Sequence, residues 1–400
     1  MTRPGTGSRD VPPEPAAVLL LLLAIVQGIA LVRVSWRLFA TARGQRIPVT
    51  PQTEAMRGLV SVIVPVLNEG ERLAPCLAGL RAQGDAVAEI LVVDGGSTDA
   101  TRQVFDQAAG RDPRLRWIDA PPVPVGWNGK AWNLETGRQH SAPSTRWVLT
   151  IDADVRPEAN LVSSLLATAK SGGLQAITVA TPQQLADTGD AILHPALLAT
   201  LVVRYGIPGS IPSRPEEVQA NGQCFLIDRA ALEEVGGFAG GRRSLIEDVT
   251  LGRDLVRNGA RLLFAEPEAA GTLLQVAMYA SWRETWQGWT RSLPMRDATS
   301  GPGWWSRMAD MTLVQGMPLP AMLLLNRGSG GSAGGRFLRS VNLAALAMRL
   351  GLLIGMRRAY RQPPPTYWLS PLLDPAVVAR LWAQALRRDH VWRGRPITRE

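Results

Sequence analysis

Two pairs of acidic residues are the first candidates for chemistry in this sequence. Asp152 and Asp154 follow an apolar run, and Glu247 and Asp248 open a segment with helical character. Hard cations such as Mg²⁺ or Mn²⁺ commonly bind through one or two carboxylates together with substrate phosphates. A carboxylate can also take the proton from an attacking hydroxyl group. The pairs therefore indicate metal binding and base catalysis, with a solvated loop and a helix N-terminus as their respective alternatives.

Two further polar segments follow apolar runs. Residues 65–69 read Pro-Val-Leu-Asn-Glu, and residues 94–99 read Asp-Gly-Gly-Ser-Thr-Asp. Glycine lets the backbone approach a ligand closely, and Ser or Thr can cap a following helix. Each segment alone is an ordinary strand-to-helix turn, so a ligand site here requires a fold that brings the segments together.

The histidines and cysteines form no catalytic or metal-binding pattern. His140, His194 and His390 are scattered, and Cys76 and Cys224 lack the spacing of zinc ligands. Two cysteines are too few for a disulfide framework. We therefore expect the histidines to be structural or surface residues and the catalytic part to face the reducing cytosol.

Apolar runs alternate with helical segments over most of the chain. The expected strands are 59–66, 89–94, 147–152, 174–180, 223–227 and 261–265, and the expected helices are 69–83, 98–109 and 130–140. This alternation predicts an α/β fold with a mostly parallel, doubly wound sheet flanked by helices. Such sheets bind ligands at the carboxyl ends of their strands, where the polar segments fall.

The uncharged run 16–32 is long enough to cross a bilayer as a helix, at the lower end of the usual range. The charges before it cancel, whereas Arg33, Arg37, Arg43 and Arg46 follow it. The positive-inside rule then places the bulk of the chain in the cytoplasm, at the plasma or inner membrane. We expect a tail over 1–15, a membrane anchor over 16–40 and a connector over 41–58, with a buried N-terminal helix as the alternative.

The C-terminal part differs in composition from the sheet region. Trp282, Trp286 and Trp289 would share one face of a helix within 271–310, which fits either an interfacial membrane helix or a core-packing face. Two apolar segments within 311–360 are separated by a Gly/Ser-rich linker, 328–335, and suggest a membrane hairpin. Residues 361–400 complete the chain as a C-terminal tail.

Composition excludes several classes of protein. The chain has 400 residues, of which 46% are hydrophobic and 19% charged, so it is neither a small stapled scaffold nor a disordered tail. Its net charge of +9 raises nucleic-acid binding as one option. The basic residues form no stripe interleaved with aromatic residues, however, and we therefore expect no nucleic-acid partner.

The order of these motifs resembles glycosyltransferase family 2. The matching segments are 61–65 (Ser-Val-Ile-Val-Pro), 92–99 (Val-Val-Asp-Gly-Gly-Ser-Thr-Asp), Gly129-Lys130-Ala131 with Asn133, Asp152-Ala153-Asp154 and Glu247-Asp248. The resemblance implies a GT-A fold, Rossmann-like, over 59–270, and inverting transfer from a nucleotide-activated sugar.

The resemblance also implies roles for individual residues. Pro65, Asn68, Glu69 and Asp94 would contact the nucleotide base and ribose. Asp152 and Asp154 would match the metal and diphosphate motif, with Asp154 holding a Mg²⁺ or Mn²⁺ ion, and Lys130 would lie near the sugar-diphosphate. Asp248, with Glu247 beside it, would be the catalytic base. Single displacement with inversion needs one carboxylate near the acceptor hydroxyl and no covalent nucleophile, which agrees with this set.

Three segments narrow the resemblance to membrane-bound members that glycosylate carotenoids, hopanoid-type polyprenoids or related lipids. They are 126–130 (Gly-Trp-Asn-Gly-Lys), 220–223 (Ala-Asn-Gly-Gln) and 392–395 (Trp-Arg-Gly-Arg). Cellulose and ceramide-type relatives carry Gln-x-x-Arg-Trp, whereas 287–291 here reads Gln-Gly-Trp-Thr-Arg, which disfavours a processive synthase. The acceptor-side candidates are Trp127, Gln223, Trp289 and Arg291.

The expected function is transfer of a sugar, with UDP-glucose as the leading donor, to a membrane-embedded lipid at the cytoplasmic face. The alternatives within the enzyme class are a polyprenyl phosphate or a polysaccharide acceptor. A nucleotidyltransferase would need a Gly- and Arg/Lys-rich triphosphate loop, which 65–72 does not supply. A non-catalytic scaffold would be expected to lack Asp154 or Asp248, and both are present.

Overall fold

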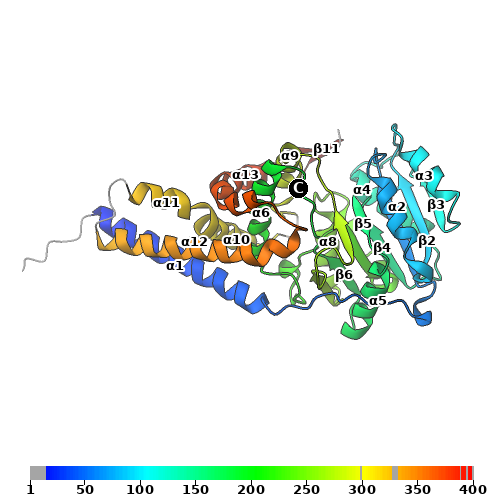
Figure 1. Ribbon diagram of the computed structural model, residues 1–400, viewed down its shortest axis with the longest axis horizontal. Coiled ribbons are helices and arrows are strands. Elements are labelled where there is room, and N and C mark those ends of the chain that lie inside the picture. The colour runs from blue at the N-terminus through cyan, green and yellow to red at the C-terminus, as the bar shows by residue number, and fades with distance from the viewer. Residues whose placement is uncertain (1–14, 298–299, 327–331, 388, 393–394, 399–400) are drawn as a thin grey trace, which may run out of the picture.

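The structure is a computed structural model that describes residues 15–297, 300–326, 332–387, 389–392 and 395–398. A sheet with its flanking helices occupies one end of the molecule, and the long helices α1 (Pro15–Thr41) and α12 (Ala333–Met356) extend toward the other end, where α11 (Pro318–Leu325) lies (Figure 1). Most of the predicted tail 1–15, the first half of the predicted linker 328–335, and Arg393 and Gly394 lie outside the described residues.

The sheet has seven strands in the order β3-β2-β1-β4-β7-β6-β8. The strands are β1 (Val60–Val66), β2 (Val87–Asp94), β3 (Leu115–Asp119), β4 (Trp147–Ile151), β6 (Ala176–Val179), β7 (Cys224–Asp228) and β8 (Leu262–Ala265). Strand β7 runs antiparallel to both neighbours, and the other four pairings are parallel. The prediction of a mostly parallel α/β sheet is therefore confirmed.

Helices cover both faces of this sheet and continue into the C-terminal part. They are α2 (Leu73–Arg81), α3 (Thr101–Ala109), α4 (Gly129–His140), α5 (Leu161–Gly172), α6 (Thr188–Tyr205), α7 (Arg229–Glu234), α8 (Glu247–Arg257), α9 (Trp282–Ser292), α10 (Pro302–Met311), α11 (Pro318–Leu325), α12 (Ala333–Met356) and α13 (Asp374–Leu386). Two small two-stranded antiparallel sheets pair β5 (Val155–Pro157) with β9 (Leu274–Val276) and β10 (Asp389–Trp392) with β11 (Arg395–Thr398).

All six predicted strands are present, with ends that differ by no more than two residues. The predicted helix at 69–83 is shorter, because Glu69 to Arg72 form turns before α2 begins at Leu73. Strand β3 was not predicted, because its burial is incomplete and its sequence, Leu-Arg-Trp-Ile-Asp, carries charges. The central strands show the continuous apolar character of strands buried on both faces.

Two helices are long and apolar enough to cross a membrane: Pro15–Thr41, which is α1, and Ala333–Ala359, which contains α12. They lie side by side (Figure 1). A Cβ atom at Gly334 would collide with the backbone of Ala17 and Leu21, so glycine permits this close approach. The end of the predicted linker is therefore helical, since α12 already includes residues 333–335.

The tryptophan-rich segment forms α9. Trp286 and Trp289 are half-buried against a second hydrophobic core built from α6, α10, α12 and α13. Trp282 is 42% exposed. Two of the three rings thus pack as a core face, which was one of the two alternatives for this helix.

Candidate functional site

The site lies where the carboxyl ends of β1 and β4 adjoin in the centre of the sheet. The chain leaves β1 toward α2 and leaves β4 toward the small strand β5, so the polar segments after both strands face one region. This is the topological switch point at which open α/β sheets form ligand crevices. The segments 65–69 and 152–154 therefore meet as the sequence predicted.

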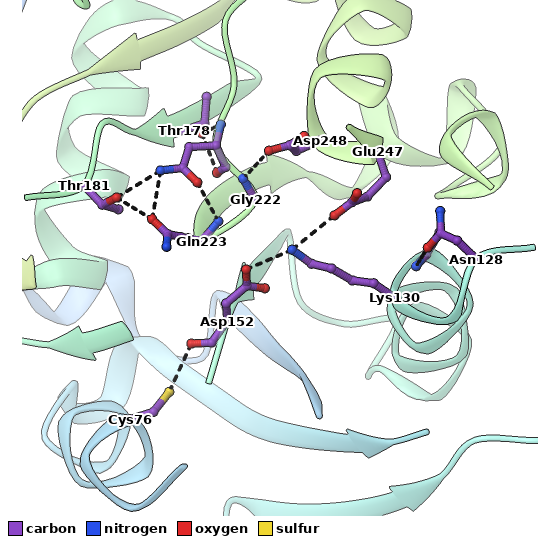
Figure 2. Close-up of polar contacts among 12 residues, drawn as sticks. Cys76, Asn128, Lys130, Asp152, Thr178, Thr181, Gly222, Gln223, Glu247 and Asp248 are labelled. Carbon is purple, nitrogen blue, oxygen red and sulfur yellow. Dashed lines mark hydrogen bonds and ion pairs between the residues drawn. The ribbon is translucent and has the colours of Figure 1, made fainter. Parts of the chain in front are cut away.

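Lys130 stands at the centre of the site (Figure 2). Its Nζ lies 2.8 Å from Oδ2 of Asp152 and 3.1 Å from Oε1 of Glu247. Asp152 follows β4 and Glu247 begins α8, so one ammonium group joins two distant parts of the chain. Burial lowers the pKa of Lys130, but the surrounding carboxylates outweigh it and raise the pKa overall, so this side chain stays charged.

The position of Lys130 depends on the start of α4. The Asn128 side chain caps this helix by accepting a hydrogen bond of 2.8 Å from the backbone N–H of Ala131. The Asn128 amide also donates to the carbonyl groups of Gly241 and Ser244, both at 3.1 Å. Asn128 thereby ties the helix that carries Lys130 to the loop that leads into Glu247.

Asp154 is set up to receive a cation. Its Oδ1 atom is buried without a hydrogen-bond partner in the described part of the chain. Burial, with the neighbouring Asp152 charge, raises the pKa of this carboxyl group. An orphaned buried oxygen is costly, and a bound cation would offset that cost.

Asp248 occupies the first turn of α8 and lies next to Gly222. Its Oδ2 accepts a 2.6 Å hydrogen bond from the Gly222 backbone N–H, and its Oδ1 accepts one of 2.8 Å from Val249. Burial and the charge of Glu247 raise the pKa of Asp248 to about 7. A carboxylate with this pKa can accept a proton at neutral pH.

A pocket opens beside these groups. Its lining includes five predicted site residues, namely Pro65, Glu69, Lys130, Asp152 and Asp154. Asn68 and Asp94 are not among the lining residues, and their side chains are engaged in turns: Asn68 Oδ1 accepts from the Thr98 N–H at 2.8 Å, and both oxygens of Asp94 accept from the Ser97 N–H at 3.0 Å.

The acceptor-side candidates occupy different environments. Gln223 is buried, and its Oε1 accepts hydrogen bonds from Thr181, Gln183 and Asn221, so it supports the loop beneath the site (Figure 2). Trp127 packs edge-on against Trp132 in the loop before α4. Trp289 stacks on His194, with ring centroids 4.2 Å apart.

Arg291, the fourth acceptor-side candidate, reaches the site from α9. Burial lowers its pKa, and the nearby Tyr279 and Glu247 act in the opposite direction. Burial, with a smaller contribution from the Asp154 charge, raises the pKa of Tyr279, so its phenol stays protonated. One side of the site is therefore formed by Arg291, from α9, and by Tyr279, from the segment after β9.

Sequence reasoning missed three residues around the pocket. Arg72 lies in the lining and pairs with Glu69 at 3.0 Å, and Asn133, quoted only as part of a motif, donates to the backbone carbonyls of Val66 and Val93. Tyr279 is the third. The Glu69–Arg72 spacing of three residues was a usable signal, whereas nothing near Tyr279 in the sequence marks it.

The residues fit a divalent metal bound together with substrate. No group of three or more His, Cys, Asp or Glu side chains within the described ranges could hold a metal ion. Asp154, with its orphaned oxygen, and Asp152 supply carboxylate ligands, so the remaining ligands would have to be diphosphate oxygens and water. Mg²⁺ and Mn²⁺ accept this arrangement.

Comparisons with known proteins agree with this geometry. Residues 61–250 match the sequence model of glycosyl transferase family 2. A glycosyltransferase from Streptococcus pneumoniae, GlyG, is 28% identical over 110 residues, which are 28% of this chain and 35% of that protein. The succinoglycan biosynthesis protein ExoA from Rhizobium meliloti is 34% identical over 61 residues, 15% of this chain and 18% of its own. The chain thus spans about a third or less of the relatives' lengths.

A solved structure extends the likeness to the whole chain. The mannosyltransferase PcManGT from Pyrobaculum calidifontis, solved in complex with GDP-Man and Mn²⁺, superposes with a TM-score of 0.55 at 19% identity, covering 92% of this chain and 97% of that one. At this identity the likeness concerns the fold, which is GT-A-like. Together with the family match over residues 61–250, it confirms the prediction of a GT-A-like glycosyltransferase domain for the central part of the chain.

Proposed function

We propose that this protein is an inverting, metal-dependent glycosyltransferase that moves a sugar from a nucleotide-sugar donor, with UDP-glucose as the first candidate, to a lipid embedded in the membrane. The observation that carries this proposal is the contact of Lys130 with both Asp152 and Glu247. This contact joins the carboxyl end of β4, where the donor would bind, to the acidic first turn of α8.

The donor would lie in the pocket between β1 and β4. Pro65, Asn68, Glu69 and Asp94 suit the base and ribose, because they lie at the carboxyl ends of β1 and β2, and Pro65 and Glu69 also line the pocket. Asp152 and Asp154 would hold the diphosphate through a Mg²⁺ or Mn²⁺ ion, which stabilises the negative charge of the leaving group. Lys130 would bind the same diphosphate after exchanging its carboxylate partners.

Asp248 would act as the base. The acceptor hydroxyl oxygen attacks the anomeric carbon while the bond from that carbon to the diphosphate oxygen breaks, and the hydroxyl proton passes to a carboxylate oxygen of Asp248. The nucleoside diphosphate leaves with the electron pair of the broken bond. Attack from the face opposite the leaving group inverts the anomeric centre, so no covalent intermediate with the protein is needed.

The hydrophobic helices support a lipid acceptor. A soluble sugar nucleotide and a bilayer-embedded alcohol can react only at the membrane surface, and α1 and α12 would hold the sheet domain there. We propose the cytoplasmic face of the plasma or inner membrane, with a carotenoid or other polyprenoid alcohol as acceptor. A polyprenyl phosphate or a polysaccharide is the rival acceptor.

The decisive test is transfer of labelled sugar into the organic phase by membranes that contain the protein and lipids from its native host. UDP-glucose and GDP-mannose should be compared, because the archaeal structure was solved with GDP-Man. Label should appear with the wild type and a divalent metal, and disappear with Asp248→Asn. Asp254→Asn, a change on the same helix at a carboxylate that pairs with Arg257, is the matched control.

Other outcomes would redirect the proposal. Label in an insoluble polymer would identify a polysaccharide acceptor, and label in an acid-labile lipid phosphate would identify a polyprenyl phosphate. Transfer that survives in Asp248→Asn would contradict the assignment of the base.

A further inference from the structure

The 3₁₀ segment Pro365–Leu373 (η8) presents an apolar outer face beyond the candidate membrane helices. Residues three apart share a face in a 3₁₀ helix. Tyr367 and Ser370 are fully buried, whereas Leu369 and Leu372 are 47% and 60% exposed, with Trp368 beside them at 44%. Single exposed apolar residues are ordinary, but a row of them on one side of a short helix marks an interaction surface.

Hydrogen bonds from the buried side of η8 determine where this segment lies along α12. The Tyr367 hydroxyl donates to the backbone carbonyl of Leu353, and Arg349 donates to the Ser370 hydroxyl at 3.1 Å. Both partners lie in the last turns of α12. The exposed face of η8 therefore lies level with the end of this candidate span.

The arginines that follow α12 indicate that this end of the helix would lie at the edge of a bilayer. Ile354, in the last turn of α12, is 69% exposed, and the exposed basic residues that follow it are Arg357, Arg358 and Arg361. Basic residues directly after an apolar helix sit among lipid headgroups and attract anionic lipids. Tryptophan also favours this zone, where Trp368 would be.

We propose that the outer face of η8, formed by Trp368, Leu369 and Leu372, inserts into the headgroup–acyl boundary of the leaflet on the catalytic side. The occupant is the lipid surface, because this apolar face lies level with the end of a candidate span, which exposed arginines follow. The inference rests on the membrane association in the proposed function and adds a third point of contact to it.

This contact would set the height of the acceptor side of the site above the membrane. Segment η8 packs along α6. His194 of α6 is joined to Tyr360 by a hydrogen bond of 2.9 Å and stacks on Trp289 of α9. Helix α9 also carries Arg291, so the lipid surface is linked to the site through packed side chains.

The test uses an environment-sensitive fluorophore attached to single introduced cysteines in the full-length protein. The sites are Leu372→Cys on η8, Ile354→Cys on α12 and Val125→Cys in a fully exposed loop of the sheet domain. Cys76 and Cys224 are both buried, so the wild type provides the labelling background. Each labelled protein is reconstituted into phosphatidylethanolamine–phosphatidylglycerol vesicles with or without nitroxide lipids.

We expect the Leu372→Cys probe to emit at shorter wavelength than the Val125→Cys probe and to be quenched at least about twofold more by shallow nitroxide lipids. Quenching at Ile354→Cys without quenching at Leu372→Cys would overturn this inference alone. Absence of quenching at both positions would overturn this inference together with the membrane contact at the end of α12, while leaving attachment through α1 to be tested separately. A blue-shifted Leu372→Cys probe that lipid nitroxides leave unquenched would indicate a protein partner, and would equally overturn the inference.

Discussion

Burial and a neighbouring carboxylate, Glu247, both shift the pKa of Asp248 in the same direction. Both raise its pKa to about 7, and Lys130 opposes them. A base must be deprotonated to accept a proton, so activity is lost as pH falls below the raised pKa. We expect kcat/KM to fall about tenfold per pH unit below pH 7. A pH profile that stays flat down to pH 5 would exclude Asp248 as the titrating base.

Replacing Asp248 by Asn separates catalysis from binding. The amide is nearly the same size but accepts no proton at neutral pH. We expect kcat to fall by roughly 10²- to 10⁴-fold while the Kd for the sugar nucleotide stays nearly unchanged, because the donor binds mainly at the other end of the site. Calorimetry and initial rates measure the two effects. Asp254→Asn should change neither, and a large loss of donor affinity in Asp248→Asn would reassign the residue to donor binding.

For Asp154 we expect the opposite pattern, in which a substitution weakens metal-dependent donor binding. Its buried Oδ1 has no partner in the described part of the chain, and Asp154→Asn removes a ligand for the metal without changing volume. We expect Mn²⁺ to improve donor affinity in the wild type and to lose at least about tenfold of that effect in the variant. Thermal unfolding without metal should be unchanged or shifted upward, because a buried charge has been removed. Metal-dependent donor binding of wild-type strength would contradict the metal assignment.

At the scale of elements, the packing of α4 on the sheet determines where Lys130 lies. A Cβ atom at Gly137 would come within 2.5 Å of Cγ2 of Ile63 on β1 and 3.1 Å of Cγ2 of Val93 on β2. Gly137→Ala should therefore destabilise the protein by about 1–3 kcal/mol despite the better helix propensity of alanine. Gly303→Ala on α10, where the added atom meets nothing within 4 Å, should be neutral or slightly stabilising. Equal melting temperatures for the two variants would refute this packing argument.

The elements show why part of the fold could be predicted from sequence. The central strands are buried on both faces, so their apolar runs are continuous and easily recognised. Strand β3 was not predicted, because it lies at the sheet edge and Arg116, Trp117 and Asp119 are not fully buried, so its sequence lacks a continuous apolar run. The antiparallel direction of β7 also has no local signal, since it depends on which strands β7 pairs with.

The site was predictable where motif residues lie at strand ends. Lys130, Asp152 and Glu247 meet in the structure because β4 ends, and α4 and α8 begin, at the same edge of the sheet. Tyr279 and Arg72 come to the pocket through tertiary packing, and the sequence around Tyr279 indicates no role. Gln223 illustrates the limit of motif reasoning: its position is beside the site, but its side chain belongs to a buried network with Thr181 and Gln183.

At the scale of the whole molecule, the helices α1 and α12 run parallel. Ala17 lies near Gly334, Gln27 donates to Asn342 at 2.8 Å, and Ser35 contacts Met348 at 3.7 Å, so residue numbers increase in the same direction along both. Each candidate span has 27 residues and is therefore about 40 Å long, sufficient for a bilayer. Both would leave the membrane on the side of the sheet domain.

Parallel spans require the chain to cross back between them. The bent pair of Pro302–Gly316 and Pro318–Leu325 runs along α1 in the opposite direction. Asp310 pairs with Arg33 and Arg37 near the sheet domain, whereas Leu325 packs with Ala24 farther along. We therefore predict three crossings, with the bent pair as one complete span rather than a re-entrant loop.

Labelling of intact cells with a membrane-impermeant maleimide tests this topology. Asn326→Cys, at the end of α11, should react from outside, whereas Val125→Cys in the sheet domain should react only after the membrane is permeabilised. The buried Cys76 and Cys224 keep the wild-type background low. If Asn326→Cys also reacts only after permeabilisation, the bent pair does not cross. Since α12 is parallel to α1, α12 then could not span either, and the molecule would be held by α1 and surface contacts alone.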